Sequence, residues 1–191
     1  MHEILSEGKI NNFKLEKFEI NKENRPIRCN ISDGKYIRLL NKKECVMSNT
    51  DMEKNTNWKI VNVANGDVFI AGLGIGLIIL PIQEKENVKT VTILEKYPEI
   101  IELVGKQLPL NDKVKIIQGD VFDYQFPRGT KFDSIYFDIW EYVNIDVYKE
   151  MLKLKKKYRK YKKSKKDNQN VNMSCWAEYY AKNNKRLDDW F

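Results

Sequence analysis

The sequence predicts an α/β fold whose central element is a parallel β-sheet. Three observations lead to this prediction. Short apolar runs rich in β-branched residues alternate with helix-like segments between Gly66 and Phe137. The first run, at 67–71, leads directly into three closely spaced glycines within Gly66–Gly76 (GDVFIAGLGIG). Acidic residues follow the later runs, at positions where parallel strands present their carboxyl ends to a ligand.

We expect three parts in the 191 residues. Residues 1–65 form an N-terminal β-meander and a lead-in helix. Residues 66–143 form the parallel-sheet core. Residues 144–191 form a basic amphipathic helix followed by a C-terminal tail.

In the N-terminal part, alternating runs at 27–31 and 36–40 flank Asp33-Gly34, which predicts a type I′ hairpin. A third run at 44–47 completes a three-stranded meander, with Cys29 and Cys45 in its core. The following TDME sequence matches a capping box, in which the Thr50 hydroxyl and the Glu53 carboxylate satisfy the first backbone groups of a helix.

The core follows a strand–helix alternation with right-handed crossovers. Helices are predicted at 75–85 and from Pro98, which suits the first helical position. The predicted strands are at 67–71, 88–94, 114–117 and 132–137. No convincing fifth, sixth or seventh strand follows.

The C-terminal part holds most of the positive charge. Between Lys149 and Lys166 the sequence has eleven basic residues and one acid, Glu150, whereas the whole chain carries only +7. Apolar residues at helical spacing predict a helix of about 20 residues with one buried stripe. The stripe contains Val147, Met151, Leu154, Tyr158 and Tyr161. A short last helix is predicted around Trp176–Tyr180.

Composition excludes several classes of site. The only histidine is His2, near the start of the sequence, which argues against histidine-based triads and ordinary zinc sites, so no metal is predicted. Three scattered cysteines form no disulfide framework and favour a reducing, cytoplasmic setting. The longest apolar run, at 68–82, is too short to span a bilayer, and the first residues lack a signal-peptide core.

The strand ends together predict a site for an adenosine-containing ligand. Glycines at 72–76 let the backbone turn tightly near a ligand. Glu95, at the end of the second strand, can accept hydrogen bonds from both ribose hydroxyls. Asp120, after the third strand, can accept from an adenine amino group. Leu77 occupies the third glycine position of a dinucleotide fingerprint, and no phosphate-cradling lysine is present, which favours a cofactor without phosphates.

The segments AGLGIG, ILEK, QGDVFD and FDSIYFDIW resemble the class I S-adenosylmethionine (SAM)-dependent methyltransferase fold, a Rossmann-like fold. The nearest branches are spermidine-synthase-like proteins and small phage-type methyltransferase-like proteins. The resemblance covers residues 44–142. It implies that Gly72, Gly74 and Gly76 form the turn beside the methionine part of SAM, and that Glu95 contacts the ribose. It also implies that Asp120 and Val121 frame the adenine, and that Asp138 lies beside the sulfonium.

The residues after the fourth strand leave the reaction open. Three roles are open for Asp138: it is a general base, its charge attracts the sulfonium, or it is the N-cap of a helix. Trp140 and Tyr142 contact a substrate or pack in the core, and Glu141 lies nearby. No (N/D)PP(Y/F) motif and no DSSDP-like acid pair is present. The alternatives to methyl transfer are aminopropyl transfer and a SAM-binding or nucleic-acid-binding protein without catalysis.

The basic segment Lys153–Lys166 is a candidate nucleic-acid contact. A lysine-rich helix binds phosphates without sequence preference and in a salt-dependent way. The alternative is a solvated helix face. We expect Lys153, Lys156, Lys157, Lys160 and Lys163 to face water, because Glu150 alone cannot neutralise them.

Overall fold

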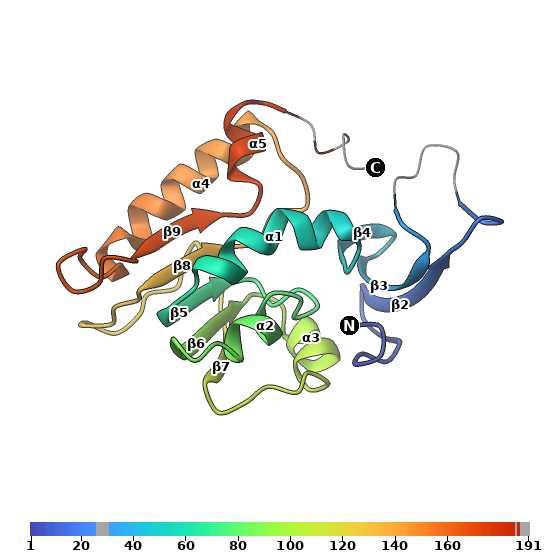
Figure 1. Ribbon diagram of the computed structural model, residues 1–191, viewed down its shortest axis with the longest axis horizontal. Helices are drawn as coiled ribbons and strands as arrows, with labels where there is room; N and C mark the ends of the chain where they lie inside the picture. The colour runs from blue at the N-terminus through green and yellow to red at the C-terminus, as the bar shows by residue number, and fades with distance from the viewer. Residues whose placement is uncertain (26–30, 186, 188–191) are drawn as a thin grey trace.

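The computed structural model describes residues 1–25, 31–185 and 187 of the chain, and Figure 1 shows two β-sheets side by side. The larger sheet has five parallel strands in the order β7-β6-β5-β8-β9. Numbered along the chain, this order is 3-2-1-4-5, which is the order of doubly wound Rossmann-like sheets. Its strands are β5 (Gly66–Ala71), β6 (Val88–Glu95), β7 (Val114–Gln118), β8 (Ser134–Phe137) and β9 (Asn172–Cys175).

The fifth strand corrects the sequence prediction, which had no strand after β8. The segment 172–175 (NMSC) lacks an apolar run, so its sequence does not indicate a strand. It pairs in parallel with the whole of β8 at the edge of the sheet. The Asn172 N–H also donates to the Asp133 carbonyl, and the Trp176 N–H to the Phe137 carbonyl. Main-chain pairing therefore adds this strand, and no sixth or seventh strand occurs among the described residues.

The smaller sheet is antiparallel, in the order β1-β2-β3-β4. Its strands are β1 (Gly8–Ile10), β2 (Phe13–Ile20), β3 (Gly34–Asn41) and β4 (Glu44–Ser48). The predicted pairing was wrong, because the partner of β3 is β2, with Gly34 opposite Ile20. Gly34 also has no positive φ, so it does not form the predicted type I′ turn. Residues 27–30 of the predicted hairpin, with Cys29, lie outside the described residues.

Helices cover both faces of the parallel sheet. They are α1 (Asp51–Val63), α2 (Ile79–Gln83), α3 (Pro98–Ile100) continued by a π-helix (Ile101–Gly105), α4 (Ile145–Tyr158) continued by a 3₁₀ turn (Arg159–Tyr161), and α5 (Glu178–Lys182). The helix expected at 75–85 is thus only one turn long, because the glycine turn extends to residue 78. Pro98 does begin a helix, as predicted.

The two faces of β5 divide the core. Val68 and Ile70 face one hydrophobic cluster, which joins α1, α2 and the antiparallel sheet. Phe69 and Ala71 face the other cluster, which α4 covers. The predicted apolar stripe of α4 is confirmed, because Val147, Met151, Leu154, Tyr158 and Tyr161 are all buried. The Tyr158 ring stacks on the Phe69 ring, with a centroid distance of 5.2 Å.

Candidate functional site

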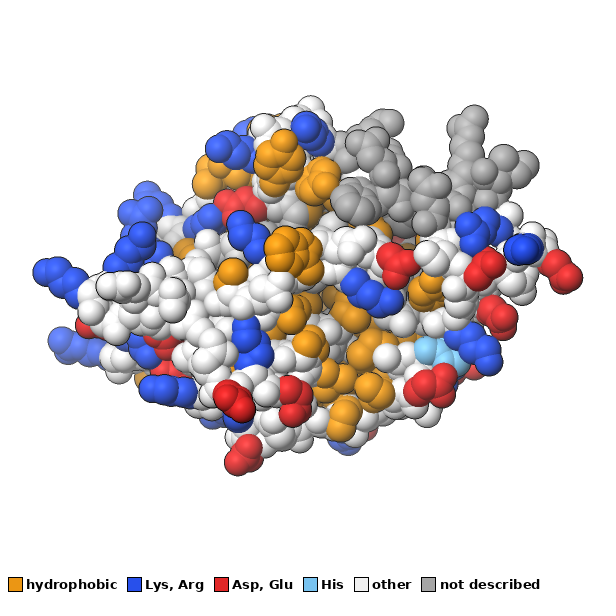
Figure 2. Space-filling model, in the orientation of Figure 1, with side chains coloured by type: hydrophobic (Ala, Val, Ile, Leu, Met, Phe, Trp, Pro, Cys, Tyr) orange, Lys and Arg blue, Asp and Glu red, His pale blue; other side chains and the backbone are white. Residues whose placement is uncertain are grey.

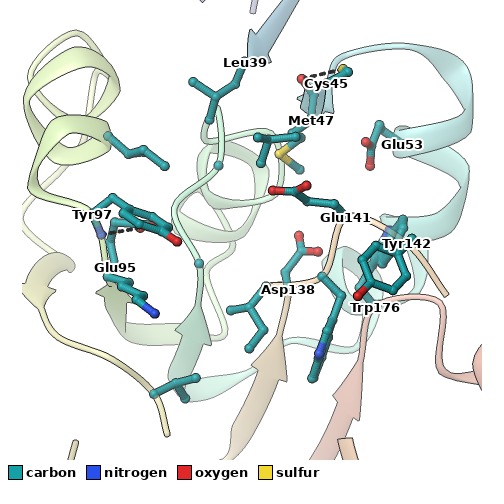
Figure 3. Close-up of a pocket in the computed structure, with 18 of the residues that line it drawn as sticks. Leu39, Cys45, Met47, Glu53, Glu95, Tyr97, Asp138, Glu141, Tyr142 and Trp176 are labelled. Carbon is teal, nitrogen blue, oxygen red and sulfur yellow. Dashed lines mark hydrogen bonds between the residues drawn. The ribbon is translucent and has the colours of Figure 1, made fainter. Parts of the chain in front are cut away.

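A cavity of about 650 Å³ lies at the carboxyl ends of β5, β6, β7 and β8. Ligands of open parallel sheets bind at this edge, where the strand order reverses. Segments outside the parallel sheet close the cavity, among them strands β2, β3 and β4 of the antiparallel sheet, the starts of α1 and α3, and Trp176 after β9. Figure 3 shows side chains from these elements facing the same space. The predicted positions that line the cavity are Gly72, Gly74, Glu95, Asp120, Val121, Asp138, Trp140, Glu141 and Tyr142.

The glycine turn passes very close to neighbouring chain segments. A Cβ on Gly72, where φ is +100°, would lie 2.1 Å from the backbone oxygen of Asp138. A Cβ on Gly74 would lie 2.3 Å from the Met47 sulfur. Gly76 is the one glycine of the turn that is not among the residues lining the cavity, and its α-carbon faces Leu108. The first two glycines thus bring the end of β5 against β8 and β4 at the rim of the cavity.

Glu95 is a buried carboxylate that holds the turn in place. Its two oxygens accept hydrogen bonds from the backbone N–H groups of Leu73, at 2.8 Å, and Tyr97, at 2.9 Å. Burial raises the pKa of Glu95, and these backbone hydrogen bonds oppose that rise. A carboxylate has about four acceptor positions, so both oxygens can still accept from a ligand.

Asp120 is half-buried and already has two partners. One oxygen accepts from the Phe122 N–H at 2.8 Å, and the other lies 3.0 Å from the Lys96 ammonium. Burial by itself would raise the pKa of Asp120, yet these two contacts lower it overall. The buried Val121 beside it accepts a hydrogen bond from the Tyr158 hydroxyl through its carbonyl, at 3.0 Å. The end of β7 is therefore anchored to α4.

Asp138 projects into the cavity, and Glu141 and Glu53 lie beside it (Figure 3). Burial raises the pKa of Asp138 to about 7. Burial also raises the pKa of Glu53 to about 8, with a further contribution from the negative charge of Asp138. Glu141 is more exposed, and its pKa is raised by burial and by the nearby Glu44. The three acids thus share a region that disfavours negative charge.

The helix-cap role of Asp138 is excluded by where the next helix begins. α4 starts at Ile145, and its N-cap is Asn144, whose side chain accepts from the Val147 N–H at 2.8 Å. Among the described residues, no side chain donates a hydrogen bond to the Asp138 carboxylate.

The two aromatic candidates behave differently. Trp140 packs against both hydrophobic clusters, and its indole N–H donates to Glu150 at 3.1 Å. Tyr142 is 63% exposed and lines the cavity without core contacts. Trp140 is therefore a packing residue of the core, whereas the exposed Tyr142 side chain can contact a bound molecule.

Glu53 is the functional candidate that the sequence analysis missed. The predicted capping box was wrong, because the Thr50 hydroxyl bonds to the Ser48 hydroxyl, at 2.9 Å, and makes no cap hydrogen bond. Glu53 is instead buried at the cavity wall, with 7% of the residue exposed. Cys45 and Met47 from β4 also line the cavity. Glu53 shares the buried face of α1 with Asn57 and Ile60, whereas Trp58 is exposed, so the apolar pattern of the helix gave no signal for it.

The sequence predicts neither a metal site nor a membrane span. Within residues 1–25, 31–185 and 187, no group of three or more His, Cys, Asp or Glu side chains is arranged to hold a metal ion. None of the helices in these ranges combines the length and apolar character that crossing a membrane requires.

Comparisons with known proteins give partial structural similarities. No protein-family profile matches the chain, and no curated protein does. Spermidine synthase from Thermotoga maritima aligns with a TM-score of 0.47 and 16% identity, over 75% of this chain and 50% of that one. A spermidine synthase bound to the transition-state analogue AdoDATO gives 0.46 and 17%, over 70% and 45%. The plantazolicin methyltransferase BpumL, bound to a desmethylPZN analogue and SAH, gives 0.41 and 16%, over 59% and 41%.

This chain therefore spans half or less of each of these proteins. The strand order of the parallel sheet, rather than these scores, identifies the fold. The predicted α/β fold with a Rossmann-like parallel sheet is confirmed through five strands.

Proposed function

We propose that this chain is a SAM-dependent methyltransferase that holds SAM in the cavity at the carboxyl ends of β5–β8. The observation that carries the proposal is the convergence of four successive strand ends on one cavity. These ends supply the glycine turn, Glu95, Asp120 and Asp138, each lining the same space. The volume of about 650 Å³ suits a ligand of nucleoside size.

The proposed cofactor contacts follow the order of the strands. Gly72 and Gly74 of the turn face the methionine part, and Glu95 accepts from the ribose hydroxyls with its remaining acceptor positions. Asp120 and Val121 frame the adenine. Asp120 keeps its contact with Lys96, which fixes the carboxylate in place.

On the acceptor side, we assign proton transfer to Asp138. SAM, when bound, supplies an electrophilic methyl group on a positively charged sulfur. A pKa of about 7 lets Asp138 take a proton from an attacking group near neutral pH and later release it. Glu141 and Tyr142 lie at the open side of the cavity, where an acceptor would enter, and Trp140 forms the wall between them and α4.

The cofactor assignment is tested by binding. SAM or S-adenosylhomocysteine should raise the melting temperature and give a calorimetric binding isotherm, whereas NAD should do neither. Glu95→Gln removes a charged acceptor, and the loss of about 1.5–3 kcal/mol predicts roughly 10- to 100-fold weaker SAM binding. Glu102→Gln removes the same charge from an exposed position and should bind SAM normally. Stabilisation by NAD and not by SAM would contradict the assignment.

Aminopropyl transfer is the second candidate, and the acid cluster is the observation that favours it. Glu53, Asp138 and Glu141 face the cavity, whereas its lysine, Lys96, already pairs with Asp120. Burial raises the pKa of Glu53 and of Asp138, and the ammonium group of a bound amine would offset this penalty on their ionised forms.

Mass spectrometry distinguishes the two reactions. We would incubate the protein with SAM or decarboxylated SAM and a set of amines, nucleic acids and peptides. The added group, methyl or aminopropyl, identifies the reaction. SAM binding without either product would support the remaining alternative, a SAM-binding protein without catalysis.

A further inference from the structure

A basic surface lies away from the cavity. Figure 2 shows Lys and Arg side chains gathered at the left end of the molecule, where Figure 1 places the end of α4 and the loops beside it. Lys131 reaches this surface from another loop, because its ammonium donates to the Lys160 carbonyl at 2.8 Å. We define the basic surface as the exposed residues Lys131, Lys153, Lys156, Arg159, Lys160, Lys165 and Lys166.

Two lysines expected on this surface are not part of it. Lys163 is drawn inward and pairs with Asp67 at 2.8 Å and Asp133 at 2.7 Å. Lys157 donates to backbone carbonyls of residues 121–122. The expectation that both face water was therefore wrong, and so was the idea that Glu150 is the only acid available to the segment.

The cations of the basic surface have no acidic partner among the residues that the structure describes. Its nearest acid in sequence, Asp167, accepts hydrogen bonds from Ser164 instead. Like charges held this close repel one another, and a polyanion relieves that repulsion. We propose that the basic surface docks the phosphate backbone of a double-stranded nucleic acid.

Two features favour a duplex over a single strand or a membrane. The only aromatic side chain between Arg159 and Lys166 is Tyr161, which is buried beneath the Lys160 ammonium, 4.9 Å from the ring centre. Bases of a single strand would thus find no stacking platform. Between Lys149 and Lys166 the one exposed large apolar side chain is Leu152, at 47%, and a single such residue gives little insertion into a bilayer. Lysine also predominates over arginine, so the contacts are to phosphates and not to base edges.

The basic surface begins at Lys153, eight residues into α4 and about 12 Å along the helix, and extends past its C-terminal end, whereas the cavity lies at its N-terminal end. The helix begins just after Val143, a cavity residue, and its 14 residues extend about 20 Å to Tyr158. A docked duplex therefore lies beyond the cavity, and its binding requires no cofactor. The docking proposal is independent of the proposed methyl transfer.

The charge sets the expected salt dependence. If five cations each neutralise one phosphate, the slope of log K against log salt is about −4.5. Raising KCl from 50 to 200 mM should then weaken binding by roughly 10²- to 10³-fold.

The test is fluorescence anisotropy with a labelled 20-base-pair DNA duplex of mixed sequence, without SAM. Replacing Lys153, Lys156, Lys160, Lys165 and Lys166 by glutamine should remove most of the binding and flatten the slope. The same five positions changed to arginine should retain both, because the charge remains. The matched control replaces five exposed lysines elsewhere: Lys9, Lys22, Lys35, Lys43 and Lys59. The control has the same net charge as the glutamine variant and should bind like the wild type.

Three results would overturn the proposal. The first is no wild-type binding to the duplex at 50 mM KCl. The second is equal loss of binding in the control and the glutamine variant, which would show that net charge alone matters. The third is preference for a single strand of the same length, or for vesicles with anionic lipids, over the duplex. Circular dichroism melting checks that all variants are folded.

Discussion

Replacing Glu53 by glutamine should remove much of a pH-dependent loss of stability. Burial and the charge of Asp138 raise the pKa of Glu53 to about 8 in the folded protein, from 4.5 in the unfolded chain. Between these two values the folded state holds a proton that the unfolded state has released. Stability is therefore fully present below pH 4.5 and falls as pH rises towards 8.

The size of this loss follows from the pKa difference. One pKa unit corresponds to about 1.4 kcal/mol, so the unfolding free energy should drop by about 3–5 kcal/mol across the window. Asp138, whose pKa is raised from 3.8 to about 7, adds a similar but not additive contribution, because the two charges interact. In Glu53→Gln, Asp138 titrates alone, and the drop should be clearly smaller.

The measurement is urea denaturation at pH 5 and pH 8. The control is Glu102→Gln, which removes an acid that is 52% exposed and should follow the wild-type curve. If wild type and Glu53→Gln lose the same free energy between the two pH values, Glu53 is ionised in the folded protein. The inference that burial and the charge of Asp138 keep Glu53 protonated in the folded protein would then be wrong.

Three further outcomes are expected. Gly72→Ala should cost at least about 2 kcal/mol in urea denaturation, because φ is +100° and the new Cβ would lie 2.1 Å from a backbone oxygen of Asp138; a wild-type unfolding curve would contradict this. Asp138→Asn should lower turnover by roughly 10²-fold while SAM affinity changes little, and unchanged turnover would remove Asp138 from the mechanism. Lys163→Met should cost about 2–3 kcal/mol, because Asp133, 4% exposed, would lose its cation; an unchanged melting temperature would show that the pair contributes nothing.

The sequence by itself determined the four central strands and the turn between the first strand and its helix. Each strand was a run of β-branched or aromatic residues, and the observed bounds differ from the predicted ones by at most two residues. The buried stripe of α4 was equally clear, because its spacing follows the helix period. These features depend on residues close in sequence, so a local pattern is enough to reveal them.

The tertiary structure decided the features that depend on distant partners. β9 forms from a polar segment because the edge of β8 offers it main-chain partners, and β3 pairs with β2 and not with the run before it. Glu53 enters the cavity wall because α1 packs beside β4. Lys163 turns inward to Asp67, 96 residues away. Such contacts are set by the packing of whole elements, so no local pattern of residues carries them.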